Sequence, residues 1–448
     1  MKLFTAQDLV LVIVYVGIIY AIALRLRSIQ REKGLDSQYF IGGLTAKLIG
    51  VTAFCFIYGI VYGDGDTVQY YRGAVAMSNL PFENFDAFFD ILVNNNLSKQ
   101  NFAQFNGSTG FPPHYMWKDS GTFSVVRYST IFCFIGAKSF FVTSMLIASF
   151  SYIGIWKVYR LFQSLYPETK KALAISILFL PSLLFWGSGI MKDSFVLSST
   201  CWFTYNFYHV FIIRKKVVPN LFLLIINLGI IISIKPYIIL SLLPGALLWL
   251  NNAYLKQMAS KALKYIMMPV IGVFVLGAGA FLYQNMGSLM GDYGNIDQAV
   301  EKAKVIKQDL LRSEQYGTNN YDLGEINGSV SGLASIAPMA IFTALYRPLF
   351  FEIGSVMMII TTLENTALLF FTFLLFYRIR WRNMIRILLG EPLIMYSVFF
   401  SLLLAFGVGM ASTNFGALSR YKLPFMPFYF SALYLIYFLN THKEERII

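Results

Sequence analysis

Long apolar runs separated by short polar or basic segments dominate the chain from beginning to end. Most runs are roughly 20 residues long, the length at which an α-helix spans the hydrocarbon core of a bilayer. The pattern predicts an all-α polytopic membrane protein with about eleven transmembrane helices. The predicted spans cover about 8–24, 47–63, 139–160, 172–186, 194–213, 219–234, 236–252, 265–284, 354–377, 392–410 and 423–440.

Basic residues are concentrated in alternate connections between the spans, as in 214–216 and 378–382. Because short cytoplasmic connections carry an excess of Lys and Arg, this distribution places the N-terminus outside and the C-terminus inside. It also places two long segments outside, 64–122 and 285–352. We treat residues 1–448 as one integral membrane domain that carries these two external segments.

Composition supports this class of protein and excludes others. Of the 448 residues, 57% are hydrophobic and only 13% are charged, more apolar than any soluble domain requires. The 36 Lys and Arg outnumber the 23 Asp and Glu, giving a net charge of +13. Because most of these cations flank spans, we predict the lipid bilayer as the partner and no nucleic acid. Three cysteines lie within apolar runs and are expected to be buried and unpaired.

The first external segment contains a helical pattern. Apolar residues recur at i, i+3, i+4 and i+7, at Phe85, Phe88, Phe89 and Leu92. This spacing predicts a helix lying along the membrane interface. The polar stretch 96–111 that follows is predicted to be a mobile loop.

The second external segment also contains an amphipathic pattern. Its apolar positions are Ile296, Val300, Ala303 and Leu310, which share one face of a predicted helix. Residues 317–332 are rich in Gly, Asn and Ser and are predicted to form a flexible lid or linker.

Two carboxylates directly follow the second predicted span, in Gly63-Asp64-Gly65-Asp66. Carboxylates at a membrane surface can act as a general base or together hold a divalent cation such as Mg²⁺ or Mn²⁺. The alternative is an ordinary external turn, since Asp-Gly is common in turns.

A second polar group lies where the chain re-enters the membrane. Pro181 interrupts the outgoing span, and a glycine-rich turn leads to Lys192-Asp193 at the start of the next helix. A helix N-terminus beside a lysine is a natural anion site. The simpler interpretations are that Asp193 is a helix cap and that Lys192 extends to the lipid headgroups.

Further charged residues are predicted on the same side of the membrane. Lys235 occupies a short external hairpin, and Arg347 and Glu352 precede the span at 354–377. Arg420, at the start of the last span, has the geometry to clamp a phosphate bidentately. Lys422 either adds a point charge to that clamp or anchors the helix at the lipid headgroups.

Glu364 is an acidic residue near the middle of the predicted span at 354–377. An ionisable residue in a membrane span usually pairs with another polar group. The two interpretations are pairing with a buried base and simple packing of helices against each other, and we favour the packing role.

Three short motifs resemble the GT-C class of membrane glycosyltransferases, which use polyprenyl-phosphate-linked sugars. Asp66 stands in Gly-Asp-Thr-Val-Gln-Tyr-Tyr, similar to the external acidic motif that carries the catalytic carboxylate of that class. Pro-Ser-Leu-Leu-Phe-Trp followed by Lys192-Asp193 resembles the segment near the lipid phosphate. Arg420-Tyr421 before Leu423-Pro424 resembles the final-span Arg-Tyr signature. Membrane O-antigen polymerases share such a loop and basic clamp and are the nearest rival.

The resemblance implies a hexosyl or pentosyl transferase in the cytoplasmic (inner) membrane, with its active face periplasmic or extracellular. The donor would be a polyprenyl-phosphate-linked sugar and the acceptor a glycan, a lipid or a protein. Asp66 and Asp64 would be catalytic, with either no cofactor or a divalent cation on them. The residues expected to bind the donor phosphate are Lys192, Arg420, Lys235 and Tyr421, with Asp193, Arg347 and Glu352 in support.

Two alternative functions remain at this stage. The first is a polymerase that joins lipid-linked polysaccharide repeat units. The second is a transporter or flippase of a lipid-linked glycan, which would favour internal repeats and charges near the membrane midplane. We rank transport lower because the predicted charges gather at one surface and no repeat is visible.

Overall fold

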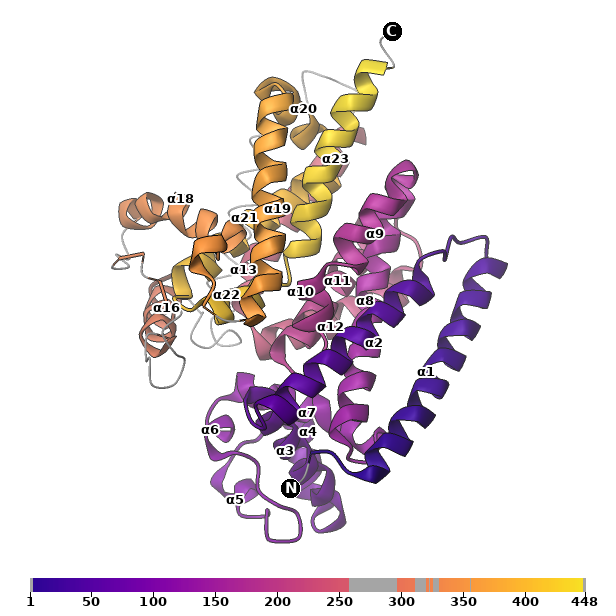
Figure 1. The fold of residues 1–448 in the computed structure, drawn as a ribbon, viewed down its shortest axis with the longest axis vertical. Coiled ribbons are helices and arrows are strands. Elements are labelled where there is room, and N and C mark those ends of the chain that lie inside the picture. Colours follow the sequence, from indigo (N-terminus) through magenta and orange to yellow (C-terminus); the bar gives the residue numbers. More distant parts are fainter. Residues whose placement is uncertain are drawn as a thin grey trace. The chain divides into compact units, whose positions relative to one another are not determined.

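The computed structural model describes residues 3–257, 296–310, 320–321, 323–324, 330–354 and 356–445. Within these residues every regular element is a helix, apart from one isolated β-bridge between Asn320 and Asn414 (Figure 1). The all-helical class predicted from the apolar runs is therefore confirmed.

Seven of the described helices are long and apolar enough to cross a membrane, and a pair of shorter helices bent by 70° makes up to eight. The seven are α1 (Ala6–Glu32), α2 with its π-helical continuation (Phe40–Val61), α8 (Phe140–Leu165), α12 (Val217–Ile234), α13 (Tyr237–Gln257), α19 (Val356–Arg378) and α21 (Pro392–Ala411). The bent pair is α22 (Phe415–Tyr421) and α23 (Met426–Glu445). Each falls on a predicted span, so a multi-pass membrane protein is supported, while the count of eleven and the orientation remain predictions.

The other three predicted spans have different outcomes. The run at 172–186 is divided into α9 (Lys170–Leu178) and α10 (Pro181–Phe185), because proline has no N–H to continue a helix and disfavours the α conformation just before it. The run at 194–213 is covered by α11 (Lys192–Phe207) and a π-helical turn. Nearly all of α11 is buried, including its many Ser and Thr, so protein rather than lipid surrounds it. The run at 265–284 lies outside the described residues.

The chain divides into two compact units, which we describe separately. Unit 1 comprises residues 1–158, 183–202 and 229–235, and unit 2 comprises 159–182, 203–228 and 236–448.

In unit 1, three span ends lie together. The Phe4 ring, just before α1, contacts the rings of Phe140 and Phe141 at the start of α8, with centroids 6.3 and 6.1 Å apart. A side chain on Gly59, near the end of α2, would collide with the same Phe4 ring. The start of α1, the end of α2 and the start of α8 are therefore on one side of unit 1, as the topology prediction requires.

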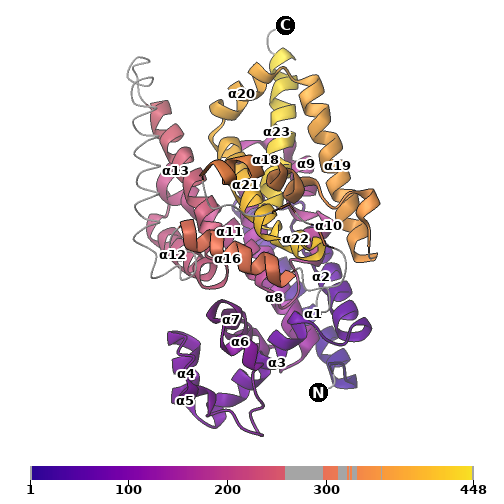
Figure 2. The same cartoon turned by 90° about the vertical axis from the view of Figure 1, so that its left-hand side faces the viewer.

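Four α-helices lie in the first predicted external segment: α3 (Asp66–Asn79), α4 (Phe85–Asn94), α5 (Lys99–Phe102) and α6 (His114–Trp117). A fifth, α7 (Ser120–Ile135), begins at its end. They gather at the end of unit 1 that holds the N-terminus (Figures 1 and 2). The predicted helix at α4 is confirmed. The residues of its apolar stripe differ in burial: Phe88 is buried against the protein, whereas Phe85 and Phe89 are exposed.

The expected loop at 96–111 has more regular structure than the sequence suggested. It contains α5 and a hydrogen-bonded turn at 106–110. The Asp90 carboxylate at the end of α4 accepts hydrogen bonds from the side-chain amides of Asn94, Asn96 and Asn101, at 2.6–2.9 Å. Most of 96–111 is nevertheless loop or turn, as predicted, and the hydrogen bonds between side chains tie this loop to the end of α4.

In unit 2, α21 packs against α13, α18 (Val330–Tyr346) and α23. The amphipathic helix predicted in the second external segment is α16 (Ile296–Leu310). Its Val300 and Ala303 are buried and pack against Leu333, Met410 and Ala411, so two residues of the predicted apolar face lie against the rest of unit 2. Most of the predicted lid at 317–332 lies outside the described residues.

Candidate functional site

The two predicted acidic residues are presented by a glycine turn and a helix start. Gly65 precedes α3 with φ of 121°, a conformation that side-chain-bearing residues rarely adopt. Asp66 is the first residue of α3 and Asp64 lies in the turn, and both are exposed. Asp64 Oδ1 accepts a hydrogen bond from Gln69 Nε2 at 2.7 Å, so the turn is tied to the helix.

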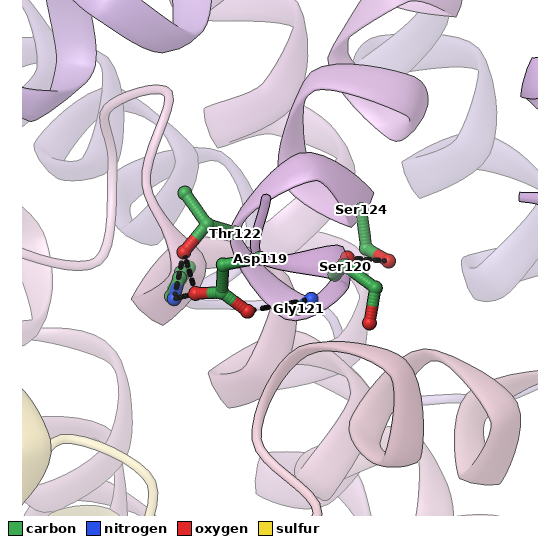
Figure 3. A network of polar contacts seen from close by, with 6 residues as sticks. Asp119, Ser120, Gly121, Thr122 and Ser124 are labelled. Carbon is green, nitrogen blue, oxygen red and sulfur yellow. Dashed lines mark hydrogen bonds and ion pairs between the residues drawn. The ribbon is translucent and has the colours of Figure 1, made fainter. Parts of the chain in front are cut away.

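A third acidic residue, which the sequence analysis did not select, lies opposite Lys192. Asp119 caps α7, accepting hydrogen bonds from Gly121 N at 3.0 Å and from the Thr122 hydroxyl (Figure 3). Its Oδ2 lies 3.7 Å from Lys192 Nζ, which also donates to Thr122 Oγ1 at 2.7 Å. The sequence signal was an N-cap before an apolar helix, which indicates a helix start but not a partner 73 residues away.

A buried lysine holds the segment that delivers Lys192. Lys47, 1% exposed on α2, donates to Leu183 O at 2.8 Å and Gly187 O at 2.7 Å. These carbonyls lie at the C-terminal end of α10, where a cation is favourable. Gly189 packs so closely on Phe54 that an added Cβ would approach its ring to 2.0 Å. The turn before α11 is therefore fixed to α2, which the sequence analysis had not predicted.

Behind Lys192 lies a buried ion pair. Lys235 Nζ is 2.6 Å from Asp193 Oδ1, and the two side chains are 6% and 3% exposed. This pair joins the first turn of α11 to the end of α12. Asp193 is in the first helical turn and is not the N-cap considered from the sequence. The charge of Lys235, predicted to bind a phosphate, is engaged within the protein.

Electrostatic coupling joins these groups into one site. Burial lowers the pKa of the Lys192 ammonium below its ordinary value. The positive charge of Lys235 lowers this pKa further. The carboxylates raise it again, Asp119 most strongly, followed by Asp66 and Asp193. Burial would raise the pKa of Asp119, but Lys192 and hydrogen bonds from Thr122 and Gly121 hold that pKa below its usual value. Asp66, Asp119, Lys192, Asp193 and Lys235 therefore form a mixed-charge cluster within unit 1.

Tyr115, on α6, belongs to the same neighbourhood. Burial, followed by the negative charges of Asp66 and Asp64, raises the pKa of its phenol to about 12. Its proton is therefore retained at neutral pH, and the hydroxyl remains a hydrogen-bond donor. The residue is 56% exposed, so it is only partly buried and remains accessible to a ligand.

The cation site considered for Asp64 and Asp66 lacks further ligands. Across the described part of the chain, no three His, Cys, Asp or Glu residues are grouped as metal ligands. A catalytic divalent cation prefers several oxygen ligands in a near-octahedral arrangement. The donor set fits a resident metal poorly, and we derive no chemical step through one.

The remaining predicted residues lie in unit 2. The Arg347 guanidinium donates to Glu352 Oε1, with Nε at 2.8 Å, and lies over the rings of Tyr321 and Phe415. Arg347 and Glu352 thus form a paired structural group. Arg420 and Tyr421 are the last two residues of α22, both partly exposed.

Unit 2 also contains two buried ionisable residues, Lys422 and Glu364. Lys422, fully buried at the bend between α22 and α23, donates to Asn365 Oδ1 at 2.5 Å. Glu364 Oε1 accepts from Ser182 N at 2.8 Å, while its buried Oε2 has no hydrogen-bond partner. The two charges also interact electrostatically. Headgroup anchoring of Lys422 is therefore wrong, and Glu364 faces a buried base as well as packing helices.

Comparison with protein-family models, curated proteins and solved structures finds no match to this chain. The geometry and chemistry of the cluster in unit 1 are therefore the basis for any functional assignment.

Proposed function

We propose that the protein is a GT-C-like glycosyltransferase that moves a sugar from a polyprenyl-phosphate donor to an acceptor hydroxyl. The observation that carries the proposal is the cluster of unit 1, in which an exposed carboxylate, Asp66, is electrostatically coupled to a partly exposed lysine, Lys192. Glycosyl transfer needs both a proton acceptor and a cation that stabilises the leaving phosphate.

In the proposed reaction, Asp66 accepts the proton of the acceptor hydroxyl as its oxygen attacks the anomeric carbon. The bond between that carbon and the donor phosphate oxygen breaks, and the phosphate leaves with the electron pair. Lys192 neutralises the departing phosphate, and attack from the opposite side inverts the anomeric configuration. Asp119 and Thr122 hold Lys192 in place, and Tyr115 donates a hydrogen bond to the bound sugar or phosphate.

The proposal includes the predicted topology. Eleven spans with the N-terminus outside would place this cluster at the outer face of the cytoplasmic membrane, where a lipid-linked donor is reached from the bilayer. Arg420 and Tyr421 of unit 2 are proposed to bind the donor phosphate as well, on the basis of their motif alone.

The direct test is turnover. Purified protein in lipid vesicles, incubated with radiolabelled polyprenyl-phosphate sugars and a panel of acceptors, is expected to release polyprenyl phosphate and form a labelled glycoside. A single added sugar identifies a transferase, and a ladder of repeat units from lipid-linked oligosaccharide identifies a polymerase. Absence of glycoside with every donor, in protein that is folded and inserted, would contradict the proposal.

The pH dependence of kcat/KM should follow the protonation state of Lys192. Because burial lowers its pKa, the lysine loses its proton at lower pH than an ordinary lysine, and kcat/KM should fall on the alkaline side below pH ~10. Lys192→Arg should move this limb to higher pH, because an arginine stays charged. Asp119→Asn should move it to lower pH, because the carboxylate that supports the ammonium is lost. An alkaline limb that stays unchanged in both variants would exclude Lys192 as its source.

A second candidate, transport of a lipid-linked glycan, is favoured by one specific feature of unit 2. Transporters bind substrates and ions at broken helices near the membrane midplane. Glu364 lies within α19, and Lys422 lies at the 70° bend between α22 and α23. Movement of a fluorescent lipid-linked glycan across the same vesicles without glycoside formation would select this function.

A further inference from the structure

The short helix α20 (Trp381–Gly390) exposes an apolar stripe on the side away from the protein. The stripe residues are 64%, 41% and 44% exposed and recur at i, i+4 and i+8: Trp381, Ile385 and Leu389. The opposite side faces the protein, where Ile387 is buried and Asn383 Nδ2 donates to Asn440 Oδ1 at 3.3 Å. Both views show α20 beside α23 (Figures 1 and 2).

Four exposed arginines lie on α20 or directly before it. Arg378 ends α19 and Arg380 precedes α20, while Arg382 and Arg386 lie one turn apart on α20. At 100° per residue, Arg382 and Arg386 flank the apolar stripe on one side. No acidic residue occurs from 378 to 390, so all charged residues of this stretch are cationic. The surface thus combines an apolar stripe with a row of guanidinium groups.

The connections of α20 fix what lies nearby. It begins shortly after α19 ends at Arg378, and α21 begins two residues after it, at Pro392. Both neighbours are long and apolar enough to cross a membrane. A helix of this length spans only about 15 Å. The helix α20 is therefore too short to cross a bilayer itself and is joined at both ends to candidate membrane spans.

We propose that α20 is a docking site for anionic phospholipids. The stripe Trp381, Ile385 and Leu389 enters the boundary between headgroups and acyl chains, and the neighbouring arginines bind the lipid phosphates. Arginine suits this role because its planar guanidinium forms two parallel hydrogen bonds to phosphate. An amphipathic helix with a cationic border binds anionic leaflets through both apolar burial and charge. This inference is independent of the proposed glycosyl transfer.

The test uses a fluorophore on α20 and a quencher on the lipid. Leu389→Cys is labelled with an apolar thiol-reactive dye, and the three native cysteines are all buried. The protein is placed in nanodiscs of equal phosphatidylcholine and phosphatidylglycerol, with only one of the two lipids brominated. We expect brominated phosphatidylglycerol to quench more strongly, and added salt to weaken that preference.

Charge variants show whether the arginines cause the preference. Arg382→Gln with Arg386→Gln should lower the relative association of phosphatidylglycerol by about tenfold or more, while quenching by lipid in general persists. The matched control, Lys302→Gln with Lys304→Gln on α16, removes the same charge elsewhere in unit 2 and should keep the preference.

Three outcomes would overturn the inference. Equal quenching by both lipids in the parent protein removes the selectivity for anionic lipid. A preference that persists without Arg382 and Arg386 removes their role. Quenching by neither lipid shows that another surface, such as a second copy or a soluble protein, covers the stripe.

Discussion

Asp66→Asn is expected to reduce glycosyl transfer by about 10²–10⁴-fold, the usual contribution of a positioned general base. Asparagine keeps the size of the side chain but cannot accept the proton of the acceptor hydroxyl. The loss should appear in kcat more than in KM, because the proton transfer occurs only in the transition state. The measurement is the initial rate with a saturating labelled donor.

The fold should survive this substitution. Asp66 is exposed at the first position of α3 and asparagine keeps its shape, so the weaker interaction with the helix dipole should cost about 0.3–1 kcal/mol. Asp86→Asn is the matched control, because Asp86 is an exposed acid in the first turn of α4, in the same external segment. It should retain full activity. Turnover near the parental rate in Asp66→Asn would end the assignment of this residue.

Asp64→Asn separates the two acidic residues of the turn. Asp64 holds Gln69 and contributes negative charge near Tyr115, so its loss should slow turnover much less than loss of Asp66. Equal losses in both variants would instead indicate that the pair acts as a unit.

The sequence predicted the features that depend on local pattern. Apolar runs of membrane length gave the helical class, and period-3.6 spacing gave α4 and the buried face of α16. Asp66 and Lys192 were found because each directly follows an apolar run and a glycine turn. These signals lie within about ten residues of the feature they predict, which is why they are visible without a structure.

The parts that were missed depend on contacts between distant segments. Asp119 has the sequence context of an ordinary helix cap, and only the fold brings it to Lys192. Lys47 was predicted at the boundary of a span. In the structure it is buried and donates hydrogen bonds to two backbone carbonyls more than 130 residues away. Apart from Glu364, the candidate charges were predicted at one surface, whereas the structure also buries Lys47 and Lys422.

Lys422→Met is expected to lower the free energy of unfolding by about 3–5 kcal/mol, the usual cost of removing one member of a buried charged pair. Methionine fills a similar volume, so the lost stability reflects the missing charge and hydrogen bond rather than a cavity. Asn365 Oδ1 loses its donor, and the buried carboxylate of Glu364 loses the cation that interacts with it. Thermal or denaturant unfolding in detergent micelles measures the change.

A double-mutant cycle tests whether Glu364 is the cause of that loss. Adding Glu364→Gln to Lys422→Met removes the uncompensated charge, and Gln can still accept the hydrogen bond from Ser182 N. The double variant should therefore recover at least half of the lost stability. Lys304→Met, at a partly exposed lysine on α16, controls for the loss of a lysine and should change stability by less than about 0.5 kcal/mol. No recovery in the double variant would show that the two buried charges are energetically independent, and it would remove the main structural reason to consider transport.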